Sequence, residues 1–284
     1  MIDVGSGPPV VLIPGIQGRW EWMSPAVDAL ERRCRVLSFS LAGDRGSGRL
    51  FEPARGFDPY LDQIEEVITR AGLADAAVCG VSFGGLVALH WAARRPERTR
   101  ALVLVSTPSP DWEPGYRVNW YLRAPKLLSP LFVAQSPFRL GPEIWRALDC
   151  VGDRLAFSGR QLARVTRSPS SPMRMAERVR LMSTIDFEAD CRQVTAPTLV
   201  LTGEPGLDRV ISVEKTRLYA DRIAGARHVT LERTGHIGLV TRPDRFAETV
   251  GRFVLRSAAR RNAMRYDGQR ETDVTDDSPV SGPV

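Results

Sequence analysis

The chain has 284 residues, of which 43% are hydrophobic and 25% are charged, and its formal net charge is +6. This composition is ordinary for a globular protein, and the length allows one large α/β domain or two small ones around a sizeable core. The basic residues are almost all arginine and lie scattered among acids, so the charge does not indicate a nucleic-acid partner.

The cysteines and the N-terminus indicate a cytoplasmic protein. Cys34, Cys79, Cys150 and Cys191 lie far apart and form no CxxC pair, which argues against a zinc site or a disulfide scaffold. The first residues lack the basic region of a signal peptide, and their apolar run is too short for one. No segment approaches the roughly 20 apolar residues that a membrane span needs.

Apolar runs bounded by glycine and proline alternate with helical patterns along the chain. Continuous apolar runs predict buried strands at 9–15, 34–43, 76–82, 100–108, 196–203 and 227–235. Helical spacing and end signals predict helices at 24–33, 58–72, 84–97, 212–225 and 243–261. The alternation predicts an α/β fold with a mainly parallel, doubly wound sheet, whose ligands bind beyond the carboxyl ends of the strands.

Residues 109–190 interrupt this alternation. The segment is rich in proline, too long for a connection, and too rich in Trp, Leu and Phe to be disordered. We expect it to form a helical cap between two parts of the core, 1–108 and 191–256. From about Ser257 the apolar periodicity is lost, so 257–284 is predicted to be a disordered tail.

The most specific motif is G-x-S-x-G within "GVSFGG" at 80–85, between a predicted strand and a predicted helix. A sharp strand-to-helix turn forces its middle residue into a strained backbone and requires very small flanking residues. The turn lifts the hydroxyl of Ser82 above the edge of the sheet, at the N-terminus of a helix that favours negative charge. The alternative is a chance match in a tight loop, which the strand and helix on either side disfavour.

With this motif in its context, the chain resembles the α/β-hydrolase family over roughly residues 8–256. The resemblance implies a serine nucleophile, an acid and a histidine base, in that order along the chain. Two departures concern loops: Pro14 stands where the family commonly has histidine, and "SLAG" at 40–43 replaces a turn that often carries an acid and an arginine. The short N-terminus predicts fewer antiparallel edge strands than is usual.

Three histidines are available as the base, namely His90, His228 and His236. His90 lies inside a predicted helix and His228 begins a predicted strand, so a packing role is expected for both. His236 follows a strand end on a glycine-bounded loop, which is where the family places its base. A serine hydroxyl needs such a base to become nucleophilic.

The acid must stand on a strand-end loop near His236. Asp208 matches the family's pattern of an aspartate before an apolar pair and a helix start, and we choose it. Glu204 directly follows the strand glycine and stays as an alternative because the loop is slightly long. Asp111 is a weaker alternative, since some relatives place their acid after the preceding strand.

The resemblance also implies an oxyanion hole made of backbone N–H groups. Phe83 supplies one, and the loop after the first buried strand supplies the second, from Ile16 or the neighbouring Gln17. The charged stretch from Arg154 to Arg180 could meet a substrate carboxylate, but we interpret it as a solvated face. Apolar residues of the expected cap could line a pocket or simply pack on one another.

The leading hypothesis is therefore a serine hydrolase that cleaves an ester-like bond (carboxylic ester, lactone, thioester or C–C) of a small apolar substrate through an acyl-enzyme on Ser82. No metal or organic cofactor is expected. An acyltransferase with the same residues is the first alternative. A non-catalytic binding protein is the second, which the intact Ser, His and Asp set disfavours.

Overall fold

The computed structural model describes residues 1–274 of the chain, and side chains as far as Ala259. Its centre is a seven-stranded sheet of order β1-β3-β2-β4-β5-β6-β7. The strands are β1 (Ile2–Val4), β2 (Pro9–Ile13), β3 (Arg35–Ser38), β4 (Ala76–Val81), β5 (Thr99–Val105), β6 (Thr198–Thr202) and β7 (Arg227–Thr230). Only the edge pair β1 and β3 is antiparallel, and the other pairings between these strands are parallel.

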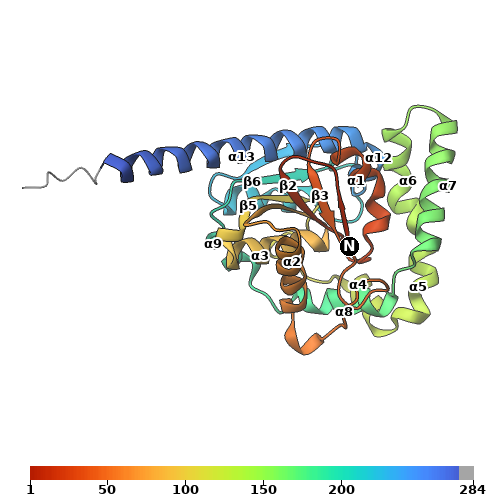
Figure 1. Ribbon diagram of the computed structural model, residues 1–284. Coiled ribbons are helices and arrows are strands. Elements are labelled where there is room, and N and C mark those ends of the chain that lie inside the picture. Colours follow the sequence, from red (N-terminus) through yellow and green to blue (C-terminus); the bar gives the residue numbers. More distant parts are fainter. Residues whose placement is uncertain (275–284) are drawn as a thin grey trace, which may run out of the picture.

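Helices cover both faces of the sheet, which confirms the predicted α/β fold (Figure 1). One face packs against α1 (Ser24–Leu30), α12 (Gly238–Thr241) and α13 (Pro243–Val274). The other packs against α2 (Asp58–Arg70), α3 (Phe83–Arg94), α9 (Phe187–Gln193) and α11 (Leu218–Arg222). Because both faces are covered, β2, β4 and β6 are buried at every position, as their continuous apolar runs predicted.

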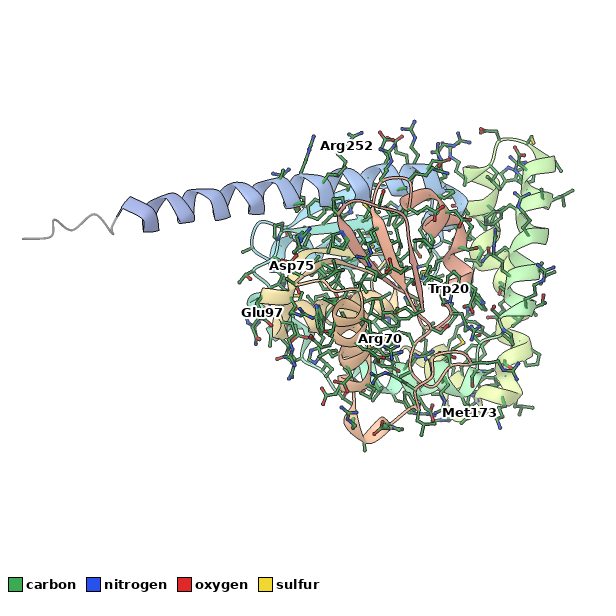
Figure 2. All side chains as sticks on the ribbon, in the orientation of Figure 1. Trp20, Arg70, Asp75, Glu97, Met173 and Arg252 are labelled. Atoms are coloured by element: carbon green, nitrogen blue, oxygen red, sulfur yellow. The ribbon has the colours of Figure 1, made fainter. Side chains whose placement is uncertain are left out.

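Between β5 and β6 the chain leaves the sheet and forms a helical insertion (Figure 1). It consists of α4 (Tyr116–Arg123), α5 (Pro125–Ala134), α6 (Ser136–Ala147), α7 (Val151–Arg167) and α8 (Pro172–Met182). The expected cap boundary at residue 190 falls inside α9, which packs against α3 of the core. The side chains around Trp20, in the short 3-10 helix Trp20–Met23, lie between the sheet and α7 (Figure 2).

The C-terminal segment differs from the prediction. Residues 257–274 were expected to be disordered, but α13 continues to Val274, while 275–284 lie outside the described residues. The segment loses its apolar stripe but contains three Ala and four Arg, residues that favour a helix by intrinsic propensity. Among the described helices, none is both long and apolar enough to cross a lipid bilayer.

Candidate active site

The carboxyl ends of the central parallel strands bring the predicted site residues to one edge of the sheet. Ser82 directly follows β4, and the loop with Ile16 follows β2, its neighbour in the sheet. Asp208 lies in the loop after β6, and His236 in the loop after β7. Segments more than 200 residues apart in the sequence therefore meet beyond the same strand ends.

Ser82 has a backbone conformation that residues other than glycine rarely adopt, with φ 52° and ψ −120°. The glycines of the motif explain how the chain reaches it. A Cβ on Gly80 would collide with the backbone of Gly84, one on Gly84 with the carbonyl oxygen of Pro14, and one on Gly85 with the side chain of Thr107. Only glycine fits at these three positions, so the motif is required by close backbone packing around the turn.

The start of α3 fixes the surroundings of Ser82. The backbone N–H of Ser82 donates to the carbonyl of Val105 at 2.8 Å, which holds the turn to the neighbouring strand. The helix begins at Phe83, and the first N–H groups of a helix have no partner within it. The N–H of Phe83 is thus on the residue next to the serine, at the positive end of the helix dipole.

The loop after β2 lies against this turn. A Cβ built on Gly15 would be 3.5 Å from the Cβ of Ser82, so little space separates the two backbones. The N–H of Gly18 donates to the carbonyl of Gly15 at 2.8 Å, which closes a tight turn, and Gly18 has φ +72°. The carbonyl of Ile16, inside this turn, accepts from Nη1 of Arg178 at 2.9 Å.

Asp208 is brought to His236. One carboxylate oxygen, Oδ2, lies 3.2 Å from Nδ1 of His236, and the other, Oδ1, accepts from the N–H groups of Val210 and Ile211 at 2.9 and 3.0 Å. Burial alone would raise the pKa of Asp208, but the charge of His236 and these hydrogen bonds outweigh it and hold the pKa below its ordinary value. The side chain of Asp208 is completely buried, whereas that of His236 is 12% exposed.

Glu204 is placed differently. Its Oε1 accepts from the N–H of Arg233 at 2.6 Å, and its own N–H donates to the carbonyl of Thr234 at 2.8 Å. Gly203 and Gly235 are so close that a Cβ on Gly203 would collide with the backbone of Gly235. Glu204 therefore fastens the loop that precedes His236, while the carboxylate beside the imidazole is that of Asp208.

The other candidates of the sequence analysis have partners elsewhere. Nδ1 of His90 lies 2.7 Å from Oδ2 of Asp190, and both side chains are buried between α3 and α9. Nε2 of His228 lies 2.8 Å from the hydroxyl of Thr202, and burial lowers its pKa. Asp111 is exposed and lies 3.5 Å from Nζ of Lys215.

Sequence reasoning missed one buried cation in the stretch from Arg154 to Arg180, which was interpreted as a solvated face. Arg178 of α8 has no exposed surface and forms an ion pair with Asp44. Its Nη2 also donates to the carbonyl of Ala42 at 3.1 Å, and its Nε to the hydroxyl of Tyr60 at 3.3 Å. With the bond to Ile16, the guanidinium joins the insertion to the loop beside Ser82. The solvated-face interpretation is therefore wrong for this arginine.

A second buried charge from the insertion, Glu143 of α6, was also missed. Its carboxylate accepts from the N–H of Ile237 at 3.0 Å and from the hydroxyl of Thr241 at 3.1 Å. Spacing could not reveal it, because a single glutamate in a helical pattern resembles any surface acid. Within the described residues, no group of three or more His, Cys, Asp or Glu is arranged to hold a metal ion.

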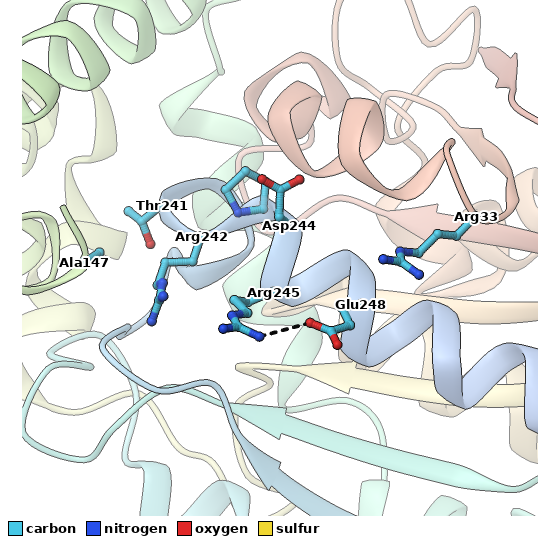
Figure 3. Close-up of a pocket in the computed structure, with 8 residues that line it drawn as sticks. Arg33, Ala147, Thr241, Arg242, Asp244, Arg245 and Glu248 are labelled. Atoms are coloured by element: carbon cyan, nitrogen blue, oxygen red, sulfur yellow. Dashed lines mark hydrogen bonds and ion pairs between the residues drawn. The ribbon is translucent and has the colours of Figure 1, made fainter. Parts of the chain in front are cut away.

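An open hollow of about 400 Å³ lies between α6 and the start of α13 (Figure 3). Its lining is mostly charged, with Arg33, Arg242, Arg245, Asp244 and Glu248 around Ala147 and Thr241. None of the proposed nucleophile, base, acid or oxyanion residues borders it. The hollow is therefore separate from the site at the strand ends.

A sequence model described as the alpha/beta hydrolase family matches residues 10–249. The chain belongs to the alpha/beta hydrolase family. Membership agrees with the sheet, the strained turn at Ser82 and the order of the strand-end residues. The protein is accordingly an enzyme of the hydrolase type.

Named relatives and solved structures are similar over nearly the whole chain. RutD of Azorhizobium caulinodans, named as a carbamate hydrolase, is 26% identical over 250 residues, covering 86% of this chain and 90% of the relative. The pimeloyl-[acyl-carrier protein] methyl ester esterase of Nitrosomonas europaea is 27% identical over 255 residues, covering 85% and 94%. The crystal structure of the enol-lactonase from Burkholderia xenovorans aligns with a TM-score of 0.71 at 22% identity, covering 89% and 95%, which shows the shared fold.

Proposed function

We propose that this enzyme is a serine hydrolase that cleaves an ester-like bond through an acyl-enzyme on Ser82. His236 is the base, Asp208 the acid that orients it, and the backbone N–H groups of Phe83 and Ile16 form the oxyanion hole. The observation that carries the proposal is the 3.2 Å contact between Nδ1 of His236 and Oδ2 of Asp208, at the sheet edge where the strained turn presents Ser82.

In the first half of the proposed reaction, Nε2 of His236 takes the proton from the hydroxyl of Ser82 as the oxygen attacks the substrate carbonyl. The carbonyl electron pair moves to oxygen, and the two backbone N–H groups stabilise the resulting negative charge. The carbonyl re-forms, the bond to the leaving group breaks, and His236 returns its proton to that group. The substrate acyl group is then bonded to Ser82 Oγ.

The second half repeats these steps with water. His236 removes a proton from the water as its oxygen attacks the acyl carbon, and then protonates Ser82 as the ester bond to the enzyme breaks. During both halves the imidazole carries a positive charge. The buried carboxylate of Asp208 faces Nδ1–H and stabilises that charge, and its two hydrogen bonds from backbone N–H groups keep it from turning away.

The relatives' names support the ester-like bond. They include a methyl ester esterase, a carbamate hydrolase and a poly(3-hydroxyalkanoate) depolymerase from Ectopseudomonas oleovorans that is 26% identical over 267 residues. A carbonyl next to an oxygen or nitrogen leaving group is common to bonds of these kinds. We infer a small, apolar acyl substrate, since the insertion beside the strand ends is rich in aromatic and aliphatic side chains.

We also propose that the enzyme is cytoplasmic. Cys34, Cys79, Cys150 and Cys191 all lie in the described part of the chain and are unpaired, as expected of a protein from a reducing compartment. Three of the thiols are buried, and Cys150 is exposed.

The test is hydrolysis of p-nitrophenyl esters of increasing acyl length by the wild type, Ser82→Ala and His236→Ala. We expect turnover to fall by at least about 1,000-fold in each variant, because the serine and the base act as one unit. The order of acyl lengths reports the size of the pocket. Turnover that survives in Ser82→Ala would contradict the mechanism. Turnover only with an added alcohol acceptor would show an acyltransferase instead.

A further inference from the structure

A buried carboxylate of the insertion reaches the loop that carries the proposed base. Glu143 lies on α6 and is only 1% exposed. Its Oε2 accepts from the N–H of Ile237 at 3.0 Å, and its Oε1 from the hydroxyl of Thr241 at 3.1 Å. The backbone of Gly235, which precedes His236, also acts to lower the pKa of this carboxyl. Glu143 thus binds the backbone directly after His236.

The charge of this carboxylate has no matching cation from lysine or arginine among the described residues. Burial raises the pKa of Glu143, whereas these backbone groups, the hydroxyl of Thr241 and the charge of His236 act to lower it. Ionised carboxylates in protein interiors are normally paired or neutralised, because burying a lone charge is costly. The charged partner available to this one is the imidazole of His236.

We propose that Glu143 is a positioning residue for His236: it holds the histidine loop through the N–H of Ile237 and the hydroxyl of Thr241 and stabilises the positively charged imidazole electrostatically. The inference rests on the proposed function for its catalytic consequence. The insertion then supports the proposed base directly, through the side chain of a residue on its helix α6.

The other charged groups near Glu143 and His236 have partners of their own. Asp208 lies 3.2 Å from Nδ1 of the imidazole and is itself buried. Arg233, in the same loop, forms an ion pair with Asp149, which lies between α6 and α7, and Arg242 donates to the carbonyl of Glu232 at 3.1 Å.

Further charged groups line two hollows that Thr241 borders. Thr241, the hydroxyl partner of Glu143, borders the charged hollow in Figure 3 together with Arg33, Arg245, Asp244 and Glu248. From α7, Asp153, Arg160 and Arg164 line a second hollow that Thr241 also borders. These groups line hollows that Thr241 borders, whereas Glu143 accepts a hydrogen bond from the histidine loop itself.

Histidine titration by NMR tests the inference without relying on turnover. The chain has three histidines, so the resonance of His236 can be assigned with His236→Ala. In Glu143→Gln we expect its titration midpoint to move to lower pH by roughly 0.5 to 1 pH unit, because a stabilising negative charge is lost. The resonances of His90 and His228 should not move. Glu177→Gln is the matched control, since this glutamate of α8 pairs with Arg174 at 2.7 Å.

The pH dependence of the kinetic constants distinguishes a positioning role of Glu143 from a purely structural one. In Glu143→Gln the acid limb of kcat/KM should move to lower pH while the plateau of kcat falls by at most about tenfold, since one unit of basicity corresponds to a factor of ten at most. KM should change little, because Glu143 is buried and its carboxylate is bound to Ile237 and Thr241. A loss of turnover with an unmoved acid limb and an unmoved His236 midpoint would overturn the inference.

A second variant covers the case in which Glu143→Gln does not fold. Glu143→Asp keeps the charge but shortens the side chain, so the contact with Ile237 should weaken. We expect its His236 midpoint to stay near that of the wild type and its kcat to fall, and a midpoint that drops as in a neutral variant would count against an electrostatic role. If the midpoint moves in Glu143→Gln but no Ser82-dependent turnover exists, the proposed function fails and the coupling stands.

Discussion

The two parts of the helical insertion differ in how they meet the core. Helices α6 and α8 each send a buried charged side chain into a loop of the proposed site, Glu143 to the histidine loop and Arg178 to the loop beside Ser82. Helices α4 and α5 contain no buried residue at all. One continuous insertion therefore has a part that is fastened to loops of the proposed site, α6 and α8, and a part that is not, α4 and α5.

The difference indicates a division of work. Charged groups that are fully satisfied in the interior fix one arrangement of the groups they bind, so α6 and α8 suit the task of holding loops in place. The exposed part is unusually apolar, with Tyr116, Leu127 and Val133 at 82%, 79% and 65% exposure. Side chains there can vary with little cost to the fold, so α4 and α5 suit the task of adapting to substrates.

The largest effect is expected at the carboxylate that faces the histidine loop, Asp208. Asp208→Asn should lower turnover by about 1,000-fold or more, because the imidazole loses the carboxylate that orients it. Glu204→Gln should retain most of the turnover, since Gln can still accept from the N–H of Arg233. Steady-state kinetics of the two variants on the same p-nitrophenyl ester give the result, and the reverse order would move the acid to Glu204.

A large loss of stability is expected when the buried ion pair between Arg178 and Asp44 is removed. Arg178→Met leaves Asp44 buried without its cation, and breaking one side of a buried ion pair typically costs about 3–5 kcal/mol. Burial raises the pKa of Asp44 even though the positive charge of Arg178 acts to lower it. A further rise in this variant would make its stability fall as pH increases above about 4.

The control for this variant lies one turn away on the same helix. Arg174→Met removes a cation that is 34% exposed and paired with Glu177, which should cost at most about 1 kcal/mol. Urea unfolding of both variants at several pH values measures the difference. Equal losses would mean that the buried pair does not fasten the insertion.

A smaller, pH-dependent effect is expected at Asp208. Its pKa in the folded state is below the ordinary value, so its ionised form stabilises the fold at pH above about 3.9 and this contribution is lost as the pH falls through the lowered value. The urea midpoints of the wild type and of Asp208→Asn should therefore differ most near about pH 6 and approach each other toward about pH 3. A gap that is constant with pH would contradict the depressed pKa.

The smallest effect on stability is expected from substitutions in α4 and α5, which contain no buried residue. Trp120→Ala on α4 and Leu127→Ala on α5 remove side chains that are 49% and 79% exposed, so unfolding free energies should stay within about 0.5 kcal/mol of wild type. The preferred acyl length should change instead. A loss of stability like that of Arg178→Met would show that α4 and α5 are fastened as well.

Much of the sheet and of the proposed site could be predicted because both follow from local patterns. Continuous apolar runs identify strands buried on both faces, and the glycines around Ser82 identify a turn that only glycine permits. His236 and Asp208 were chosen through the resemblance to the α/β-hydrolase family, which places its base and acid on loops directly after predicted strands. Their meeting point is then set by the parallel sheet.

The buried charges could not be predicted, because their partners are distant in sequence. Arg178 pairs with Asp44 across 134 residues, and Glu143 reaches Ile237 across 94. Neither residue differs in its local pattern from the exposed arginines and glutamates around it. The continuation of α13 through 257–274 was missed for the opposite reason: periodicity reports a packed face, whereas a helix can continue on propensity alone.

The central claim is that Ser82 becomes acylated with His236 as its base, and one measurement tests it most directly. The wild type, Ser82→Ala and His236→Ala are treated with a fluorophosphonate, and the labelled peptide is identified by mass spectrometry. We predict a single adduct on Ser82 in the wild type, none in Ser82→Ala, and strongly slowed labelling in His236→Ala. An adduct on another residue, or equal labelling of wild type and His236→Ala, would contradict the account.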